Sequence, residues 1–269
     1  NYGELILPGE SNEEVFLSTY ICHPSMANNE LSGPTVVTYL AKWLSQLTTH
    51  RYTYRFIFIP ETIGSITYLS RNYKHLKKNV VAGFNVSCVG DDRSYSYIPS
   101  RNGKTISDTV SKHVLKWIDP DYTVYSWLDR GSDERQYCAP GIDLPIASIL
   151  RTKYGQYPEY HTSLDNLKDV VTPKGLEGGY TAIRRALELL EKNRNYKVNV
   201  LCEPQMGKRG LYQTLSIKKK DEQGRLMMDF ISHCDGKNSL LDIADLIGVP
   251  AWNLYEIISK LESHNLISY

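Results

Sequence analysis

Side chains suited to metal binding and proton transfer follow one apolar run closely. His23 comes directly after the strand-like run that ends at Cys22, and Asn28, Asn29 and Glu30 follow within seven residues. An imidazole with nearby oxygen donors is a ligand set that suits Zn²⁺ or a similar divalent ion. A strand that ends in a polar turn is the alternative interpretation of this segment taken alone.

Further polar groups follow other apolar runs of the chain. In order they are Glu61, Asp91 with Asp92, Asp133 with Glu134, and His161. Because the carboxyl ends of parallel strands meet at one edge of a sheet, we expect these groups to converge in a cleft. Singly, each has a simpler explanation, such as a solvated turn, an Asx turn or a hydrogen-bonded histidine. Only their combination predicts a functional site.

The elements that must position these groups alternate between strands and helices. Apolar runs predict strands at 3–9, 14–22, 54–59, 80–89 and 144–150, the first two joined as a hairpin. Apolar residues at helical spacing predict helices at 34–47, 63–71, 105–117 and from Thr172-Pro173 onward. This alternation predicts an α/β fold with a mostly parallel sheet sandwiched by helices.

The composition changes after Asn193, which predicts a second, smaller domain. We expect an α/β domain at 1–195, a connecting segment at 196–225 and a winged-helix-like domain at 226–269. The last range contains helical patterns at 226–234, 239–247 and 251–264. Gly248-Val249-Pro250 separates the second from the third, which is helix-turn-helix spacing.

The bulk composition excludes several classes of protein. The 269 residues carry a net charge of +1, which gives no electrostatic reason to expect a nucleic acid or an anionic membrane as partner. No apolar run approaches the roughly 18 residues of a membrane span, and no signal peptide is visible. The five cysteines are scattered and odd in number, so we expect a reducing compartment and a cytoplasmic protein.

The predicted small domain has an acidic balance. Residues 210–269 contain six Lys or Arg and eight Asp or Glu, and the third helix carries Glu256, Glu262 and only Lys260 as a cation. Proteins that read DNA normally present a basic face to the phosphates. We therefore expect this domain to contact a protein partner, a second copy of the chain or its own α/β domain. A DNA-binding regulator is the disfavoured alternative.

Four segments, taken in order, resemble a known family. CHPSMANNELSG, FIFIPETIGS, GSDERQYCAPGIDLPIA and YHTSLDNL look like the M28-type zinc aminopeptidases. Uncharacterised bacterial aminopeptidase-like proteins with a C-terminal winged helix are more similar still. The resemblance covers roughly residues 1–193 and most of the rest. It implies a zinc-exopeptidase-like fold and a metal-dependent hydrolase acting on a peptide or aminoacyl substrate.

The resemblance also implies a role for individual residues. His23 and His161 match histidines that bind metal, and Asn29 matches the carboxylate that bridges two ions. Glu61 matches the general base, and Asp133 matches an aspartate that orients site groups. Tyr160, with Tyr154 and Tyr157 beside it, is a candidate donor to the oxyanion. Loop packing is the alternative role for these tyrosines.

Three positions depart from the family pattern. Asn29 is neutral, Thr62 stands where a second glutamate is expected, and Ser87 stands where a ligand aspartate is expected. These departures predict a single ion, zinc with iron or manganese as alternatives, in place of a pair. The sequence leaves open whether Glu30, Asp91 or Asp92 replaces the missing ligands. A catalytically inactive peptidase fold, acting through its winged-helix domain, is the alternative function.

Overall fold

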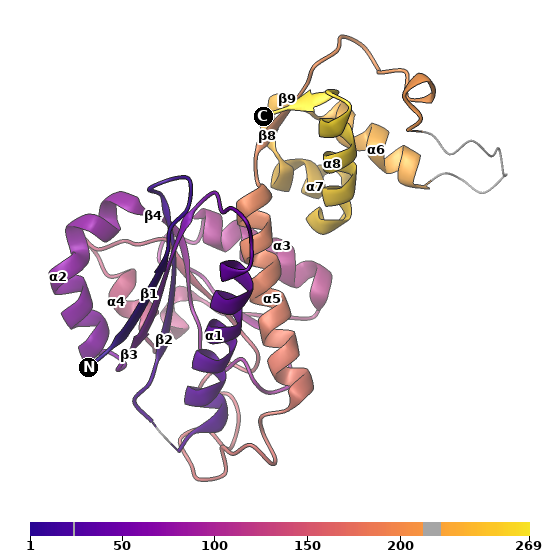
Figure 1. Cartoon of the computed structure of the whole chain (residues 1–269). Coiled ribbons are helices and arrows are strands. Elements are labelled where there is room, and N and C mark those ends of the chain that lie inside the picture. The colour runs from indigo at the N-terminus through magenta and orange to yellow at the C-terminus, as the bar shows by residue number, and fades with distance from the viewer. Residues whose placement is uncertain (24, 212–221) are drawn as a thin grey trace. The chain divides into compact units, whose positions relative to one another are not determined.

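The computed structural model describes residues 1–23, 25–211 and 222–269 of the chain (Figure 1). These residues form two compact units, Asn1–Leu187 and Glu188–Tyr269. Across the described ranges, no helix is both long enough and apolar enough to cross a bilayer.

The first unit contains a seven-stranded sheet with the order β1-β3-β2-β4-β7-β5-β6. The pairs β2–β3, β2–β4, β4–β7 and β5–β6 are parallel, whereas β1–β3 and β5–β7 are antiparallel. The strands are β1 (Gly3–Leu7), β2 (Glu14–Tyr20), β3 (Thr53–Ile59), β4 (Val80–Asn85), β5 (Ser96–Ile98), β6 (Thr123–Val124) and β7 (Ile146–Leu150). The predicted mostly parallel sheet is therefore confirmed.

Helices cover both faces of this sheet. They are α1 (Ser32–Ser45), α2 (Ile63–Asn79), α3 (Ile106–Ile118), α4 (Glu134–Tyr137) and α5 (Pro173–Lys192). In Figure 1, α2 and α4 lie on one side of the strands and α1 and α5 on the other. All seven residues of β2 are buried, as expected for a central strand between two helical layers.

The predicted hairpin between the first two strands is wrong. β3 lies between β1 and β2, so that Gly3 pairs with Phe58 and Glu14 pairs with Thr53. A fully buried strand such as β2 needs a neighbour on each side, and it finds them in β3 and β4. β1, with its middle three residues exposed, takes the edge of the sheet. The short strand β5 was not predicted, because three residues carry no readable period.

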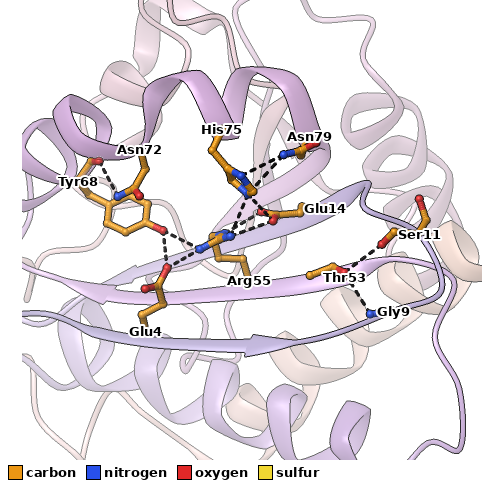
Figure 2. A network of polar contacts seen from close by, with 10 residues as sticks. All are labelled: Glu4, Gly9, Ser11, Glu14, Thr53, Arg55, Tyr68, Asn72, His75 and Asn79. Carbon is orange, nitrogen blue, oxygen red and sulfur yellow. Dashed lines mark hydrogen bonds and ion pairs between the residues drawn. The ribbon is translucent and has the colours of Figure 1, made fainter.

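An ion-pair network centred on the buried residues Arg55 and Glu14 connects this edge strand to the sheet (Figure 2). Arg55 of β3 donates to both carboxylate oxygens of Glu14 on β2 (2.7 and 2.8 Å) and to Glu4 on β1 (2.5 Å). From α2, Tyr68 donates to Glu4 (2.6 Å) and His75 Nε2 lies 2.6 Å from Glu14 Oε1. One guanidinium thus links three strands and a helix.

The second unit is a winged helix, as predicted. Its elements are β8 (Asn195–Val198), α6 (Glu222–Ser232), β9 (Asp235–Ser239), α7 (Leu240–Ile247), α8 (Tyr255–Ser263) and β10 (Ile267–Ser268). The three strands form an antiparallel sheet in the order β10-β8-β9. Gly248, with a φ of 70°, ends α7 before the turn to α8. The predicted connecting segment, 196–225, contains part of β8 and the start of α6, and its residues 212–221 lie outside the described ranges.

The Arg55 network generates a prediction about acid stability. Burial alone would raise the pKa of Glu14, but hydrogen bonds from Arg55 and His75 outweigh burial and lower the pKa below its ordinary value of 4.5. Such a group stabilises the fold above its unfolded pKa, and this stabilisation is lost as the pH falls through the lower folded pKa. We expect Glu14→Gln to reduce the free energy of unfolding at pH 7 by about 3 kcal/mol.

Urea unfolding between pH 3 and pH 7 measures this effect. The loss of stability below pH 4.5 should be less steep in Glu14→Gln than in the parent protein. Glu13→Gln, at the exposed neighbouring residue, is the control and should leave the profile unchanged. Parallel pH profiles for all three proteins would contradict the prediction.

Candidate metal and catalytic site

The site is built where four neighbouring strands end. β2, β3, β4 and β7 are parallel neighbours, so the segments that follow them emerge at the same edge of the sheet. The segment after β2 carries His23, the one after β3 carries Glu61, and the one after β7 carries His161. The sheet therefore brings together residues separated by up to 138 positions in the sequence.

A compact cluster of donor atoms forms directly after β2. His23 Nδ1 lies 2.5 Å from Glu30 Oε1, and Cys22 Sγ lies 3.3 Å from His23 Nδ1 and 3.4 Å from Glu30 Oε1. The Cys22 N–H donates to the other Glu30 oxygen (2.9 Å). Among the described residues, these three are the one group of His, Cys, Asp or Glu whose ligand atoms all lie within 4.8 Å of one another.

Glu30 reaches His23 because the chain turns tightly before α1. A π-helical turn, η1 (Ala27–Leu31), precedes Ser32 and buries Asn28, Asn29 and Glu30. Such turns are frequent at functional sites. Of the three carboxylates left open as substitutes, Glu30 is thus the one that stands beside His23.

Asp91 and Asp92 lie outside the cluster of Cys22, His23 and Glu30. Asp91 is buried and accepts hydrogen bonds from Asn28 Nδ2 (3.0 Å), from the Thr152 N–H (2.9 Å) and from Thr152 Oγ1 (2.6 Å). Asp92 accepts a hydrogen bond from Thr172 Oγ1 (3.2 Å). These contacts give Asp91 a structural role in joining the turn before α1 to the segment after β7.

His161 approaches His23 from a separate loop. The two imidazole centroids lie 5.1 Å apart, and the Tyr160 ring stacks on His161 at 3.9 Å. His161 has a φ of 57°, an uncommon backbone conformation for a residue other than glycine. It is not part of the 4.8 Å cluster, but its ring borders it.

Asp165 fixes the position of this loop. Its fully buried carboxylate accepts hydrogen bonds from the N–H groups of Asn28 (2.7 Å) and Asn29 (3.0 Å) and from the Tyr157 hydroxyl (3.0 Å). The Ala27 N–H donates to the Asp165 carbonyl (2.9 Å). The loop that carries His161 and the turn that carries Glu30 are thereby joined at a single residue.

The predicted ligand Asn29 is buried beside a tyrosine. Its Nδ2 donates to the Tyr20 hydroxyl (2.7 Å), and its Oδ1 has no hydrogen-bond partner among the described residues. The Ser87 hydroxyl, in the segment after β4, is also buried and without a partner there. An orphaned amide oxygen is a neutral ligand with a free lone pair, but it supplies no charge to balance a cation.

Glu61 is held by a strained turn. Thr62 has a φ of 63° and a ψ of −68°, and the Ile63 N–H donates to the Glu61 carbonyl (2.7 Å), which defines a γ-turn. Two contacts hold Thr62 in this conformation. Its N–H donates to Asp133 Oδ1 (2.7 Å), and its hydroxyl accepts from Arg135 (2.6 Å). Such strain costs about 1–3 kcal/mol and is concentrated at functional sites.

Two acidic groups at this turn have raised pKa values. Burial raises the pKa of Asp133 to about 7, and the carboxylates of Glu61 and Glu134 add to the rise. Burial also raises the pKa of Glu61, against hydrogen bonding from Ser132 and the nearby charges of Arg135 and His23. Glu61 is therefore a carboxylate whose proton affinity exceeds the ordinary value, as general bases require.

The three candidate tyrosines differ in their contacts. Tyr154 donates to Glu134 (2.6 Å) and Tyr157 donates to Asp165 (3.0 Å), so both hydroxyls are engaged in hydrogen bonds with buried carboxylates. The half-buried Tyr160 ring lies on His161, and its hydroxyl is not engaged in this way. Of the three, Tyr160 alone borders the site.

Sequence reasoning missed two residues. The apolar run predicts Cys22 only as the end of a strand, although its place next to His23 is a signal for a ligand. Asp165 was read only as part of a motif, although its buried contacts hold His161. The contact of Thr62 with Arg135 had no signal, because a γ-turn does not require a particular residue type.

The donor atoms present fit one divalent ion. Thiol sulfur, imidazole nitrogen and carboxylate oxygen are the three donor types that zinc takes in proteins, and here they share one cluster. The three positions that depart from the pattern of a two-ion site, Asn29, Thr62 and Ser87, are all neutral.

Comparisons with known proteins agree with this fold. The chain is 44% identical over 245 residues to a presumed polysaccharide biosynthesis protein with an aminopeptidase-like domain from Clostridium acetobutylicum, covering 90% of this chain and 56% of the relative. A crystal structure of a presumed peptidase from the same species superposes with a TM-score of 0.89 and 40% identity, covering 99% of this chain and 60% of that one. This chain thus spans less than two thirds of either protein.

A more distant structure shares only the fold. A zinc aminopeptidase from Bacillus subtilis superposes with a TM-score of 0.59 and 17% identity, covering 70% of this chain and 49% of that one.

Family assignment covers both units. Residues 194–269 match a family described as winged helix-turn-helix. Residues 1–193 match a family described as a domain of unknown function, DUF4910. Since that match covers more than half of the 269 residues, the chain belongs to the DUF4910 family.

Proposed function

We propose that the first unit is a metal-dependent hydrolase of the M28 aminopeptidase type, which cleaves an amide or peptide bond of a peptide or aminoacyl substrate. The observation that carries this proposal is the meeting of Glu61, His161 and the Cys22–His23–Glu30 cluster at one edge of the sheet. The likeness of the fold to zinc aminopeptidases supports it. We further propose a cytoplasmic location, because all five cysteines are free thiols.

In this proposal, His23 holds the ion, His161 and Asn29 are further candidate ligands, and zinc is the first choice over iron or manganese. A bound divalent ion supplies polarisation of the scissile carbonyl and acidification of water. Glu61 takes the proton of the attacking water and passes it to the leaving amine. Asp133 positions Glu61 through the Thr62 turn, and the Tyr160 hydroxyl donates to the carbonyl oxygen as negative charge develops there.

An acidic group is also needed to bind the free α-amine of an aminopeptidase substrate. Glu30 and Asp92, which follow β2 and β4, are two candidates for this role. Glu30 is buried and bonded to His23 and Cys22, which leaves Asp92, with its single hydrogen bond from Thr172, as the better candidate.

A second candidate function rests on the three neutral positions. Asn29, Thr62 and Ser87 would weaken metal binding, which favours a peptidase fold retained for binding, with the winged helix as its partner surface. The γ-turn that holds Glu61 argues against this alternative, because a non-catalytic fold has no need of a strained residue there.

The first test is metal content by elemental analysis after purification without chelator or added metal. We expect about one equivalent of zinc, iron or manganese, and its loss in a His23→Ala, His161→Ala double variant. The exposed-side-chain variant His264→Ala, in the second unit, is the control and should retain the ion. A protein that neither contains nor takes up a divalent ion would exclude the metal-dependent form of the proposal.

The second test concerns the general base. Glu61→Gln removes the proton acceptor but keeps the size of the side chain, so we expect kcat to fall about 10²–10⁴-fold while the metal content is unchanged. Aminoacyl-nitroanilides and short peptides are suitable substrates for a screen. Glu10→Gln, at an exposed loop residue, should have the activity of the parent protein. If a substrate is found and Glu61→Gln cleaves it at the parent rate, another residue is the base.

A further inference from the structure

The distances from the Cys22 sulfur to the neighbouring donor atoms are those expected between ligands of one metal ion. The sulfur lies 3.3 Å from His23 Nδ1 and 3.4 Å from Glu30 Oε1. Zinc bonds of about 2.3 Å to sulfur and 2.0–2.1 Å to nitrogen or oxygen place tetrahedral ligands about 3.3–3.6 Å apart. Both separations from the sulfur therefore lie close to those of two donors that share one ion.

Backbone groups orient this cluster. The Cys22 N–H holds Glu30 Oε2 at 2.9 Å, so that Oε1 faces the sulfur and the imidazole. The Glu61 N–H donates to Cys22 Sγ (3.3 Å). A hydrogen bond of this kind stabilises negative charge on a sulfur ligand.

Charge balance points to the same two side chains. The positions from which carboxylate ligands were expected are neutral, namely Asn29, Thr62 and Ser87. A thiolate at Cys22 and the carboxylate of Glu30 would together supply two negative charges, which balance the charge of a divalent ion.

We propose that the Cys22 thiolate and the Glu30 carboxylate join His23 as ligands of the ion, forming a mixed sulfur, nitrogen and oxygen site. This inference rests on the proposed function and specifies which residues bind the ion. Three protein ligands leave a fourth position open for water or substrate, as in catalytic zinc sites. A thiolate also favours zinc or cobalt over magnesium, calcium or manganese.

A competing arrangement uses the same residues differently. The 2.5 Å contact between His23 Nδ1 and Glu30 Oε1 is a hydrogen bond, which must lengthen if both atoms bind one ion. In the competing arrangement this bond persists, His23 binds through Nε2, and Glu30 only orients the ring. Cys22 is then outside the coordination shell, so the two arrangements differ in whether sulfur touches the metal.

Cobalt substitution distinguishes them. Co²⁺ is titrated into the metal-stripped full chain, and the absorption spectrum is recorded. Intense visible d–d bands, which aqueous Co²⁺ lacks, report that the ion is bound, and a near-ultraviolet thiolate-to-cobalt charge-transfer band reports a sulfur ligand. We expect both signals in the parent protein, loss of the charge-transfer band in Cys22→Ser, and at least about tenfold weaker cobalt binding in Glu30→Gln.

Cys202→Ser is the matched control, because Cys202 is the other exposed cysteine of the chain. It should leave both signals unchanged. Since the Cys22 side chain is exposed, Cys22→Ser should fold, and circular dichroism checks this; Cys22→Ala provides a second variant.

Each remaining outcome overturns the inference. Visible bands without a charge-transfer band would remove Cys22 from the site but leave the metal-dependent hydrolase intact. A charge-transfer band that survives in Cys22→Ser and Cys22→Ala would assign the sulfur to another cysteine. A spectrum that shows no bound cobalt would overturn the ligand assignment together with the metal-dependent form of the proposed function.

Discussion

The Asp165 carboxylate is the contact on which the candidate site depends. It accepts two backbone N–H groups at the start of η1 and one tyrosine hydroxyl, and it is completely buried. The hydrogen bonds are charge-assisted, and those N–H groups form the positive end of a helical turn, so the negative charge is compensated without a cation. Because the same residue belongs to the His161 loop, His161 and the turn that carries Glu30 share one support.

The architecture was largely predictable because its strands are apolar runs that end in polar residues. Strand β3 contains the apolar run from Phe56 to Ile59, so its end, and with it Glu61, is predictable from the sequence. The pairing of β1 was not predictable in the same way. Its partner is chosen by Arg55 and Glu14, which lie 51 and 10 positions from Glu4 and meet only in the folded chain.

The contacts of individual carboxylates could not be predicted from the sequence. Glu30 and Asp91 both follow strands and both are buried, yet one stands in the donor cluster and the other joins two loops. What separates them is the position of Asn28 and Thr152, which surround Asp91 with donors. Hydrogen-bond partners from distant segments decide whether a buried carboxylate is available to bind an ion. Residue type and local spacing do not predict these partners.

The γ-turn at Thr62 has an energetic consequence for the whole unit. A β-branched residue with positive φ makes the native state less stable than a glycine there would, since glycine adopts this conformation without steric cost. Glycine would also remove the hydroxyl that Arg135 contacts, and Glu61 would then have more conformational freedom. At this one position, a more stable fold and a more precisely fixed Glu61 side chain therefore require different residues. The chain carries threonine, which fixes Glu61 at a cost in stability.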